Sequence, residues 1–153
     1  MTNDFQSIGY AIKIIRHIHA LDGRRDTAPG IAAGTGLGRS ELGRILRLLV
    51  DFGILDAKRG VRGGYRLDRK TREISLLDVL DAVRGPNWLP ECPLGLRSCP
   101  QENRCVIHEA WTAQREQLRT YCSSVPIDEA IRTDWRRAGP TATTMASVTA
   151  DWR

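Results

Sequence analysis

The sequence predicts a mainly α-helical fold with one small β-hairpin, and three observations support this prediction. Apolar residues recur every three or four positions in several separate stretches, which is the spacing of helices with one buried face. Short alternating stretches lie on either side of the glycine-rich segment 59–64, as in a two-stranded hairpin. The 153 residues are 41% apolar, which is enough for one ordinary hydrophobic core.

The first third of the chain predicts three helices, at residues 8–21, 29–33 and about 39–52. Between the second and the third, the segment 34–38 reads Gly-Thr-Gly-Leu-Gly and predicts a tight turn, because glycine accepts left-handed dihedrals. A helix, a short glycine turn and another helix form the helix-turn-helix pattern. The expected buried faces consist of Ile8, Ala11, Ile12, Ile15, Ile18 and Leu21 in the first helix, and of Leu42, Ile45, Leu46, Leu49 and Phe52 in the third.

A β-hairpin and a fourth helix are predicted next. The segments 54–57 and 65–67 alternate as short strands do, and we interpret the hairpin that they form as a wing beside the helix-turn-helix. The fourth helix spans residues 76–84, and Ser75 and Asp78 have the spacing of a capping box at its start. Its expected apolar stripe consists of Leu77, Leu80 and Val83.

The second half predicts a loop, one long helix and an arm. Residues 85–104 lack periodicity, whereas residues 105–121 repeat by fours and threes, as in a helix that packs on a partner helix. Residues 127–135 look weakly helical, and the Thr/Ala-rich end after Pro140 is expected to be disordered. The expected partner-facing positions are Ile107, Trp111, Gln114, Leu118 and Tyr121.

Positive charge is concentrated in the first half of the chain. Residues 1–73 hold 14 Lys and Arg against 8 Asp and Glu, whereas residues 74–153 hold 9 against 10. A basic face attracts polyanions such as nucleic acid when its charges lie together. We recognise no cleavable leader and no apolar run of the roughly twenty residues that span a bilayer. We therefore expect a cytoplasmic protein.

The placement of the arginines favours DNA binding. In a helix-turn-helix the second helix enters the major groove, so the polar positions of the segment 39–47 would meet phosphates and base edges. The wing arginines could approach the phosphate chain or enter the minor groove. A solvated helix face, or nonspecific phosphate contact, would also account for these residues. The candidates are Arg39, Ser40, Glu41, Arg44, Arg47, Arg59 and Arg62.

Three cysteines and a histidine lie within seventeen residues, spaced Cys92-x6-Cys99-x5-Cys105-x2-His108. Thiolates suit the soft iron of an iron-sulfur cluster, and an imidazole can complete the ligand set. Because His108 follows Cys105 by one helical turn, we expect both side chains on one face of a helix start. Zinc is an alternative, although structural zinc sites usually use closer cysteine pairs. A thiol switch that forms a disulfide without metal is a third possibility.

Over about residues 7–130 the chain resembles the Rrf-two family of bacterial winged-helix transcriptional regulators. The resemblance is carried by Phe52-Gly53-Ile54-Leu55, by the segment 59–67, by Ala82-Val83-Arg84-Gly85 and by the three cysteines. It implies a homodimer that binds pseudo-palindromic promoter DNA and uses an iron-sulfur cluster, 2Fe-2S or 4Fe-4S, to report iron, redox state or nitric oxide. It assigns cluster ligation to Cys92, Cys99 and Cys105, with His108 where the cluster-assembly regulators have a histidine ligand.

The expected function is that of a DNA-binding regulator, a repressor, with a cluster that controls its affinity. The competing class is a small cytoplasmic cluster-binding or zinc-binding redox protein without sequence-specific DNA binding. An enzyme is not expected, because Cys105 with His108 is the only thiol and imidazole pair and no substrate pocket can be recognised. The expected parts are a winged helix-turn-helix domain (1–84), a cysteine-rich cluster-binding loop (85–104), a dimerisation helix (105–122) and a partly disordered C-terminal arm (123–153).

Overall fold

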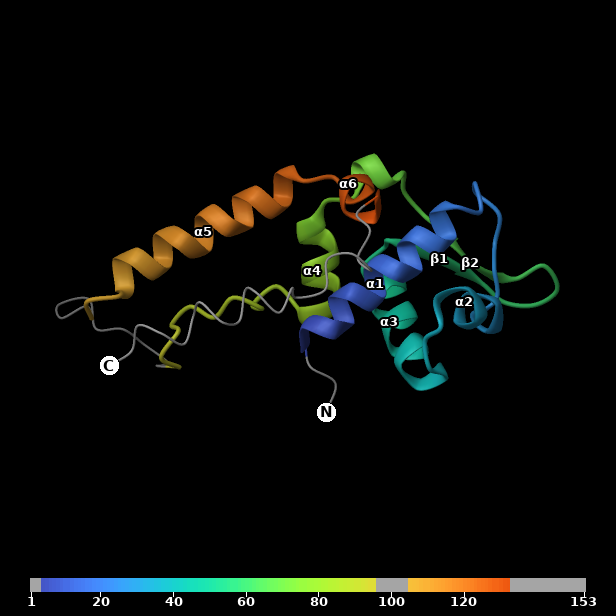
Figure 1. The fold of residues 1–153 in the computed structure, drawn as a ribbon, viewed down its shortest axis with the longest axis horizontal. Helices are drawn as coiled ribbons and strands as arrows, with labels where there is room; N and C mark the ends of the chain where they lie inside the picture. The colour runs from blue at the N-terminus through green and yellow to red at the C-terminus, as the bar shows by residue number, and fades with distance from the viewer. Residues whose placement is uncertain (1–3, 96–104, 133–153) are drawn as a thin grey trace, which may run out of the picture.

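The computed structural model describes residues 4–95 and 105–132, and this part of the chain is mainly helical with one two-stranded antiparallel hairpin. Figure 1 shows a compact group of helices with the hairpin at one end and the long helix α5 extending from the other. The predicted fold class is confirmed. The elements are α1 (Asp4–His19), α2 (Ala28–Thr35), α3 (Arg39–Asp51), β1 (Leu55–Lys58), β2 (Gly64–Leu67), the 3-10 helix η1 (Thr71–Glu73), α4 (Leu76–Arg84), α5 (His108–Ser124) and α6 (Ile127–Arg132).

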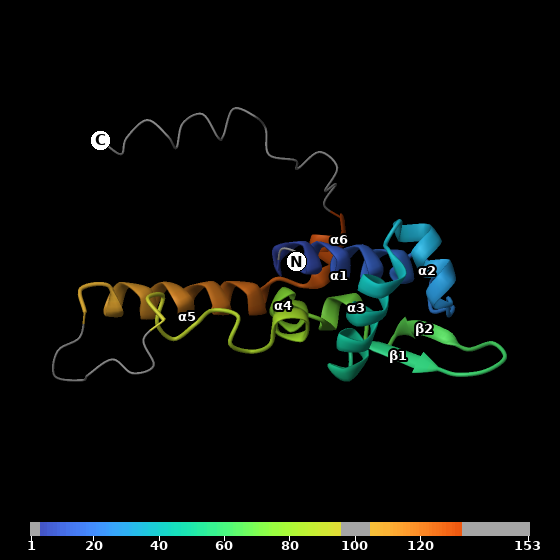
Figure 2. The same cartoon turned by 90° about the horizontal axis from the view of Figure 1, so that it is seen from below.

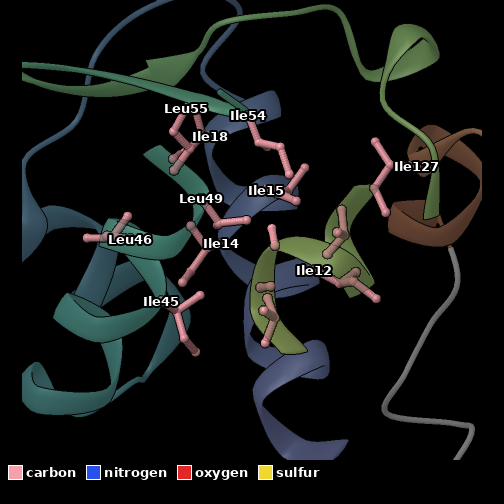
Figure 3. Packing of buried hydrophobic residues seen from close by; sticks show 14 of the residues in the cluster. Ile12, Ile14, Ile15, Ile18, Ile45, Leu46, Leu49, Ile54, Leu55 and Ile127 are labelled. Carbon is pink, nitrogen blue, oxygen red and sulfur yellow. The ribbon is translucent and has the colours of Figure 1, made fainter. Parts of the chain in front are cut away.

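The hydrophobic core lies where α1 packs against α3 and α4 (Figure 3). Branched aliphatic side chains fill it, and those of α1 recur at the predicted helical spacing. Ile127 at the start of α6 closes the core from the C-terminal side. The largest fully buried side chains are those of Ile14, Ile15, Ile18, Ile31, Leu42, Ile45, Leu46, Leu49, Ile54, Leu55, Ile74 and Ile127.

Local signals place α2 and α3 as the sequence predicts. The hydroxyl of Thr27 caps α2 by accepting from the amide of Gly30 at 3.3 Å. Gly36 ends α2 with a left-handed φ of 71°, and Gly38 stands at the N-cap of α3. The two helices and the glycine turn therefore form the helix-turn-helix, and the antiparallel register Leu55↔Leu67 forms the hairpin beside it.

Some boundaries differ from the prediction. Phe52 was expected on the buried face of the third helix, but α3 ends at Asp51 and the Phe52 side chain, at the C-cap, is 41% exposed. In α4 the buried set includes Val79 and Ala82, whereas Leu77 is only half-buried. Helix α5 continues to Ser124, inside the predicted C-terminal arm, and the short helix α6 covers residues 127–132. Residues 133–153 of the arm lie outside the described residues.

Candidate DNA interface and cysteine segment

The outer face of α3 carries the residues that are predicted to contact DNA. Arg39, Ser40, Arg44 and Arg47 are exposed, whereas the apolar side of the helix is buried against α1 and α4. In Figure 2, α3 and the hairpin lie on one side of the molecule and α1 and α6 on the other. Arg47 of α3 and Arg59 of the wing line the same groove, so the Arg47 side of α3 faces the wing.

Glu41 differs from the other predicted DNA-contacting residues of α3, because its side chain is only 21% exposed and already accepts hydrogen bonds within the protein. Its Oε1 accepts from Arg44 Nη2 at 2.6 Å and from the Ser7 hydroxyl at 3.4 Å. The hydrogen bond from Arg44 holds the pKa of Glu41 below its ordinary value, against an opposing effect of burial. Arg44 Nη2 also donates to Ser7 Oγ at 2.6 Å, so the guanidinium is oriented by α1 as well as by α3.

A groove of about 450 Å³ separates α3 from the wing. Arg47 lies on its helix side, with its side chain 84% exposed and 3.6 Å from Asp51, and Arg59 lies on its wing side. Lys58 also lines the groove, although it is not among the predicted DNA-contacting residues; its place next to Arg59 in the sequence is the signal that could have identified it. The groove is lined by Thr27, Ala28, Gly43, Arg47, Val50, Asp51, Ala57, Lys58, Arg59, Gly60, Gly63, Gly64 and Tyr65.

The tip of the wing is fully open to solvent. Arg59 and Arg62 are exposed, and Val61 between them is 95% exposed. Arg62 has a φ of 61°, which arginine seldom adopts, so the tip follows a tight path between the two strands. A cationic tip beside a cationic groove can bind two stretches of a phosphate chain.

The candidate cluster ligands lie at the two ends of the segment 96–104, which is outside the described residues and contains Cys99. Cys92 and Cys105 are free, half-buried thiols, and His108 is half-buried at the first position of α5. Within residues 4–95 and 105–132, no three His, Cys, Asp or Glu side chains are grouped as a metal site. Two thiols and an imidazole are the donor types that an iron-sulfur cluster accepts, so their chemistry fits the predicted group.

The arrangement of Cys105 and His108 differs from the prediction. Cys105 precedes α5 rather than forming its first turn, and residues 105–107 make a turn in which the His108 amide donates to the Cys105 carbonyl at 3.0 Å. Ile107 stands at the N-cap of the helix. Cys105 therefore lies in the turn that leads into α5, whereas His108 is the first residue of the helix.

The segment that carries Cys92 is tied to α4 and α5. Trp88 Nε1 donates to the Asp81 carboxylate of α4 at 3.0 Å, and Trp111 Nε1 of α5 donates to the carbonyl of Pro90 at 2.9 Å. Arg119 of α5 reaches the same Asp81 carboxylate at 3.3 Å. Since α4 packs on α3, the cysteine segment is connected to the candidate DNA face through one helix.

One face of α5 is apolar and exposed. Leu118 and Tyr121 are 42% and 63% exposed, and with Trp111 and Leu89 they line a shallow depression of about 430 Å³. Cys122 is instead buried, and this burial raises the pKa of its thiol. Leu118 and Tyr121 are two of the predicted partner-facing positions.

None of the helices in the described part of the chain combines the length and the apolar character needed to cross a membrane.

The profile of the Rrf2 (Rrf-two) family, described as "Iron-dependent Transcriptional regulator", matches residues 6–133. The chain belongs to the Rrf2 family. It is accordingly a member of a family of transcriptional regulators.

Relatives in sequence and in structure agree with this assignment. Protein aau3 of Rhizobium meliloti is 30% identical over 124 residues, or 80% of each chain. The HTH-type transcriptional regulator IscR of Xenorhabdus nematophila is 26% identical over 67% of this chain and 62% of its own length. The fold is shared with IscR of T. potens (TM-score 0.60, 19% identity, 95% and 94% of the two chains covered). It is also shared with CymR, the global cysteine regulator of B. subtilis (TM-score 0.63, 19% identity, 84% and 95% covered).

Proposed function

We propose that this Rrf2 protein is a homodimeric repressor that binds promoter DNA through α3 and the wing, and whose affinity for DNA is controlled by an iron-sulfur cluster. The observation that supports DNA binding best is the basic groove between α3 and the wing, with Arg47 on one side and Arg59 on the other. The relatives whose names state a function are transcriptional regulators, which favours a regulator over an enzyme. A regulator of promoter DNA acts where the chromosome is, in the cytoplasm.

The proposed reading residues divide by position. Arg39, Ser40 and Arg44 project from the first half of α3, where a helix inserted into the major groove meets base edges. Arg47, Arg59 and Arg62 surround the groove and the wing tip and would bind phosphate oxygens. Glu41 is expected to act through Arg44, because its carboxylate accepts from that guanidinium.

DNA binding is tested by a mobility shift with a duplex covering the DNA immediately upstream of the gene that encodes this chain. Wild-type affinity should fall steeply with salt, because bound phosphates release counterions. Arg59→Ala should bind more weakly and lower the salt slope by about 1. Arg16→Ala is the matched control, because it also removes an exposed arginine, on α1; it should leave the affinity and the salt slope unchanged. Equal behaviour of the two variants would argue against a role for the wing.

Cys92, Cys99 and Cys105 are the proposed thiolate ligands, and His108 is the proposed fourth ligand. A bound cluster would supply an iron centre whose oxidation or loss can serve as the signal. The chain contributes the connection from the Cys92 segment through Trp88 and Asp81 to α4. For regulation, the two states of the cluster must favour different arrangements of the DNA-binding parts, since a ligand without such a difference shifts no equilibrium.

The cluster is tested by the iron and acid-labile sulfide content of protein purified without oxygen, together with its visible spectrum. Wild-type protein should contain iron and sulfide in near-equal amounts. Cys99→Ala should lose both, and its affinity for DNA should no longer depend on whether a cluster has been supplied. Cys122→Ala is the matched control, because this buried thiol is not a proposed ligand. If the protein contains zinc in place of iron and still binds DNA, the proposed cluster is refuted and the proposed DNA-binding function stands. Iron without DNA binding would favour the small redox protein.

A further inference from the structure

Besides packing on the core through Leu55, the wing is bonded to Arg25 and Asp26, two consecutive residues of the link between α1 and α2. The Asp26 amide donates to the carbonyl of Tyr65 at 3.0 Å, and the Tyr65 amide donates to the carbonyl of Asp26 at 2.8 Å. These two bonds form an antiparallel bridge on β2. Asp26 thus occupies the place of a third strand, one residue long, on the outer edge of the hairpin.

The side chain of Arg25 connects both strands of the wing. Its Nη1 donates to the carbonyl of Asp56 on β1 at 3.1 Å and to the carbonyl of Gly64 on β2 at 2.9 Å. Its Nη2 donates to the Asp56 carboxylate, which also accepts from Arg66 Nε at 3.1 Å. The Arg25 side chain is only 18% exposed, so these bonds are partly shielded from water. A planar guanidinium can make such a set of bonds, and a single ammonium cannot.

The link itself is held on the body of the molecule. The Asp26 carboxylate accepts from the Thr27 amide at 2.7 Å and lies 2.8 Å from His17 Nε2 of α1. Nearby glycines make room for this arrangement. A Cβ on Gly30 would lie 2.0 Å from Asp26 Oδ1, and a Cβ on Gly64 would lie 2.4 Å from the Asp26 carbonyl. The position of the wing is therefore set by α1 and α2 as well as by its own turn.

A two-stranded hairpin alone is marginally stable in water, so its contacts with the body decide where its tip lies. The wing forms one wall of the groove, and Arg47 of α3 stands on the other. We propose that Arg25 is a positioning residue for DNA binding, which holds both wing strands so that Arg59 and Arg62 meet the phosphate chain at a fixed distance from α3. This inference rests on the proposed DNA-binding function.

The test is Arg25→Lys, which keeps the positive charge and removes the fork of donors. Arg24→Lys is the matched control, because its neighbour Arg24 is exposed and donates only to the local Leu21 carbonyl among the contacts described. With the full-length protein and the upstream duplex, Arg25→Lys should bind about tenfold more weakly and lower the salt slope by about 1, whereas Arg24→Lys should match wild type. An Arg25→Lys protein with wild-type affinity and slope would overturn the inference.

A double-mutant cycle separates positioning from general destabilisation. If Arg25 places Arg59, then Arg59→Ala should weaken binding much less in the Arg25→Lys background than in wild type. A variant that is merely less stable would lose active protein but keep both its salt slope and the full effect of Arg59→Ala. Additive losses would therefore overturn the inference. Asp56→Ala, which removes the carboxylate that accepts from both Arg25 and Arg66, should reproduce the effect in a second background.

Amide hydrogen exchange at Tyr65 provides a readout that does not depend on DNA. Exchange at this amide should become faster in Arg25→Lys, because the bond to the Asp26 carbonyl opens when the wing moves. Unchanged exchange would refute the anchoring role whatever the DNA result. Wild-type protein that fails to bind the duplex, with exchange accelerated in the variant, would instead refute the proposed function and confine Arg25 to holding the hairpin.

Discussion

Gly64 and Gly60 separate two reasons why a glycine is required in the wing. Both have a positive φ, 121° and 91°, and so both disfavour a side chain. Only Gly64 is also crowded, since an added Cβ would lie 2.4 Å from the Asp26 carbonyl, whereas a Cβ on Gly60 would meet nothing within 4 Å. The requirement at Gly64 therefore comes from a close approach of two backbones.

We expect Gly64→Ala to destabilise the protein by about 3 kcal/mol or more, because strain and a backbone clash act together. Gly60→Ala should cost only about 1 kcal/mol, from the left-handed backbone alone. Urea unfolding followed by circular dichroism measures both free energies. Equal costs would contradict the close approach at Gly64.

Ionisation of the Asp56 carboxyl should make the stability of the protein depend on pH. The hydrogen bond from Arg25, followed by that from Arg66, lowers the pKa of this carboxyl in the folded protein despite an opposing effect of burial. A lowered folded pKa stabilises the fold at pH values above the unfolded pKa of about 4, and this contribution is lost as the pH falls through the folded value.

Asp56→Asn should therefore be less stable than wild type at neutral pH, and the difference should shrink as the pH falls below about 4. Unfolding free energies over a pH series provide the measurement. The control is Glu116→Gln, at an exposed position of α5 away from the wing. A difference between Asp56→Asn and wild type that stays constant with pH would show that the carboxylate charge is not involved.

At the scale of single elements, α4 shows a complete local start signal. The Ser75 hydroxyl accepts from the Asp78 amide at 3.0 Å, and the Asp78 carboxylate accepts from the Ser75 amide at 2.9 Å. The same region bonds to the chain after α5, since the Leu76 amide donates to the Val125 carbonyl at 2.8 Å. The start of α4 therefore also holds the link between α5 and α6.

Ser75→Ala should cost about 1 kcal/mol of stability through the loss of this cap. Ser123→Ala, which removes an exposed hydroxyl bonded to the Thr120 carbonyl, should stay within about 0.5 kcal/mol of wild type. Thermal unfolding of the two variants tests the difference. Indistinguishable midpoints would mean that the capping box contributes nothing beyond an ordinary surface serine.

Some of these elements followed from the sequence and some did not. The buried positions of α1 and α3 follow the helical spacing, and Ser75 with Asp78 is a signal within four residues. Phe52 was predicted wrongly because periodicity does not tell where a helix ends, and here the backbone turns at that residue. The role of Arg25 and the contact of Glu41 with Ser7 could not be predicted, since these partners lie on other elements.

At the scale of the whole molecule, the long helix α5 exposes an apolar face to solvent. Its exposed face contains Trp111, Leu118 and Tyr121, and apolar faces of this kind usually mark an interface. The proposed occupant is a second copy of this chain, packed helix against helix as the spacing of these residues predicts.

Tyr121→Glu should shift the protein from dimer to monomer in sedimentation velocity, because a carboxylate would be placed in the apolar contact. Thr120→Glu is the matched control, as it adds the same charge at an exposed position that does not line the depression. Circular dichroism checks that both variants keep their helices. A dimeric Tyr121→Glu protein would show that this face of α5 is not the interface.

The sequence by itself determined the order and type of the main helices and of the hairpin, because periodicity, caps and glycine turns act over a few residues. Its motifs carried the resemblance to the family. The tertiary structure decided how these elements present their charges. Arg44 meets Ser7 across 37 positions of the chain, and Arg25 meets Asp56 across 31. Such contacts depend on how packed helices and strands approach one another, and no local pattern encodes them. The groove between α3 and the wing, and the anchor that sets it, therefore become visible only in the folded molecule.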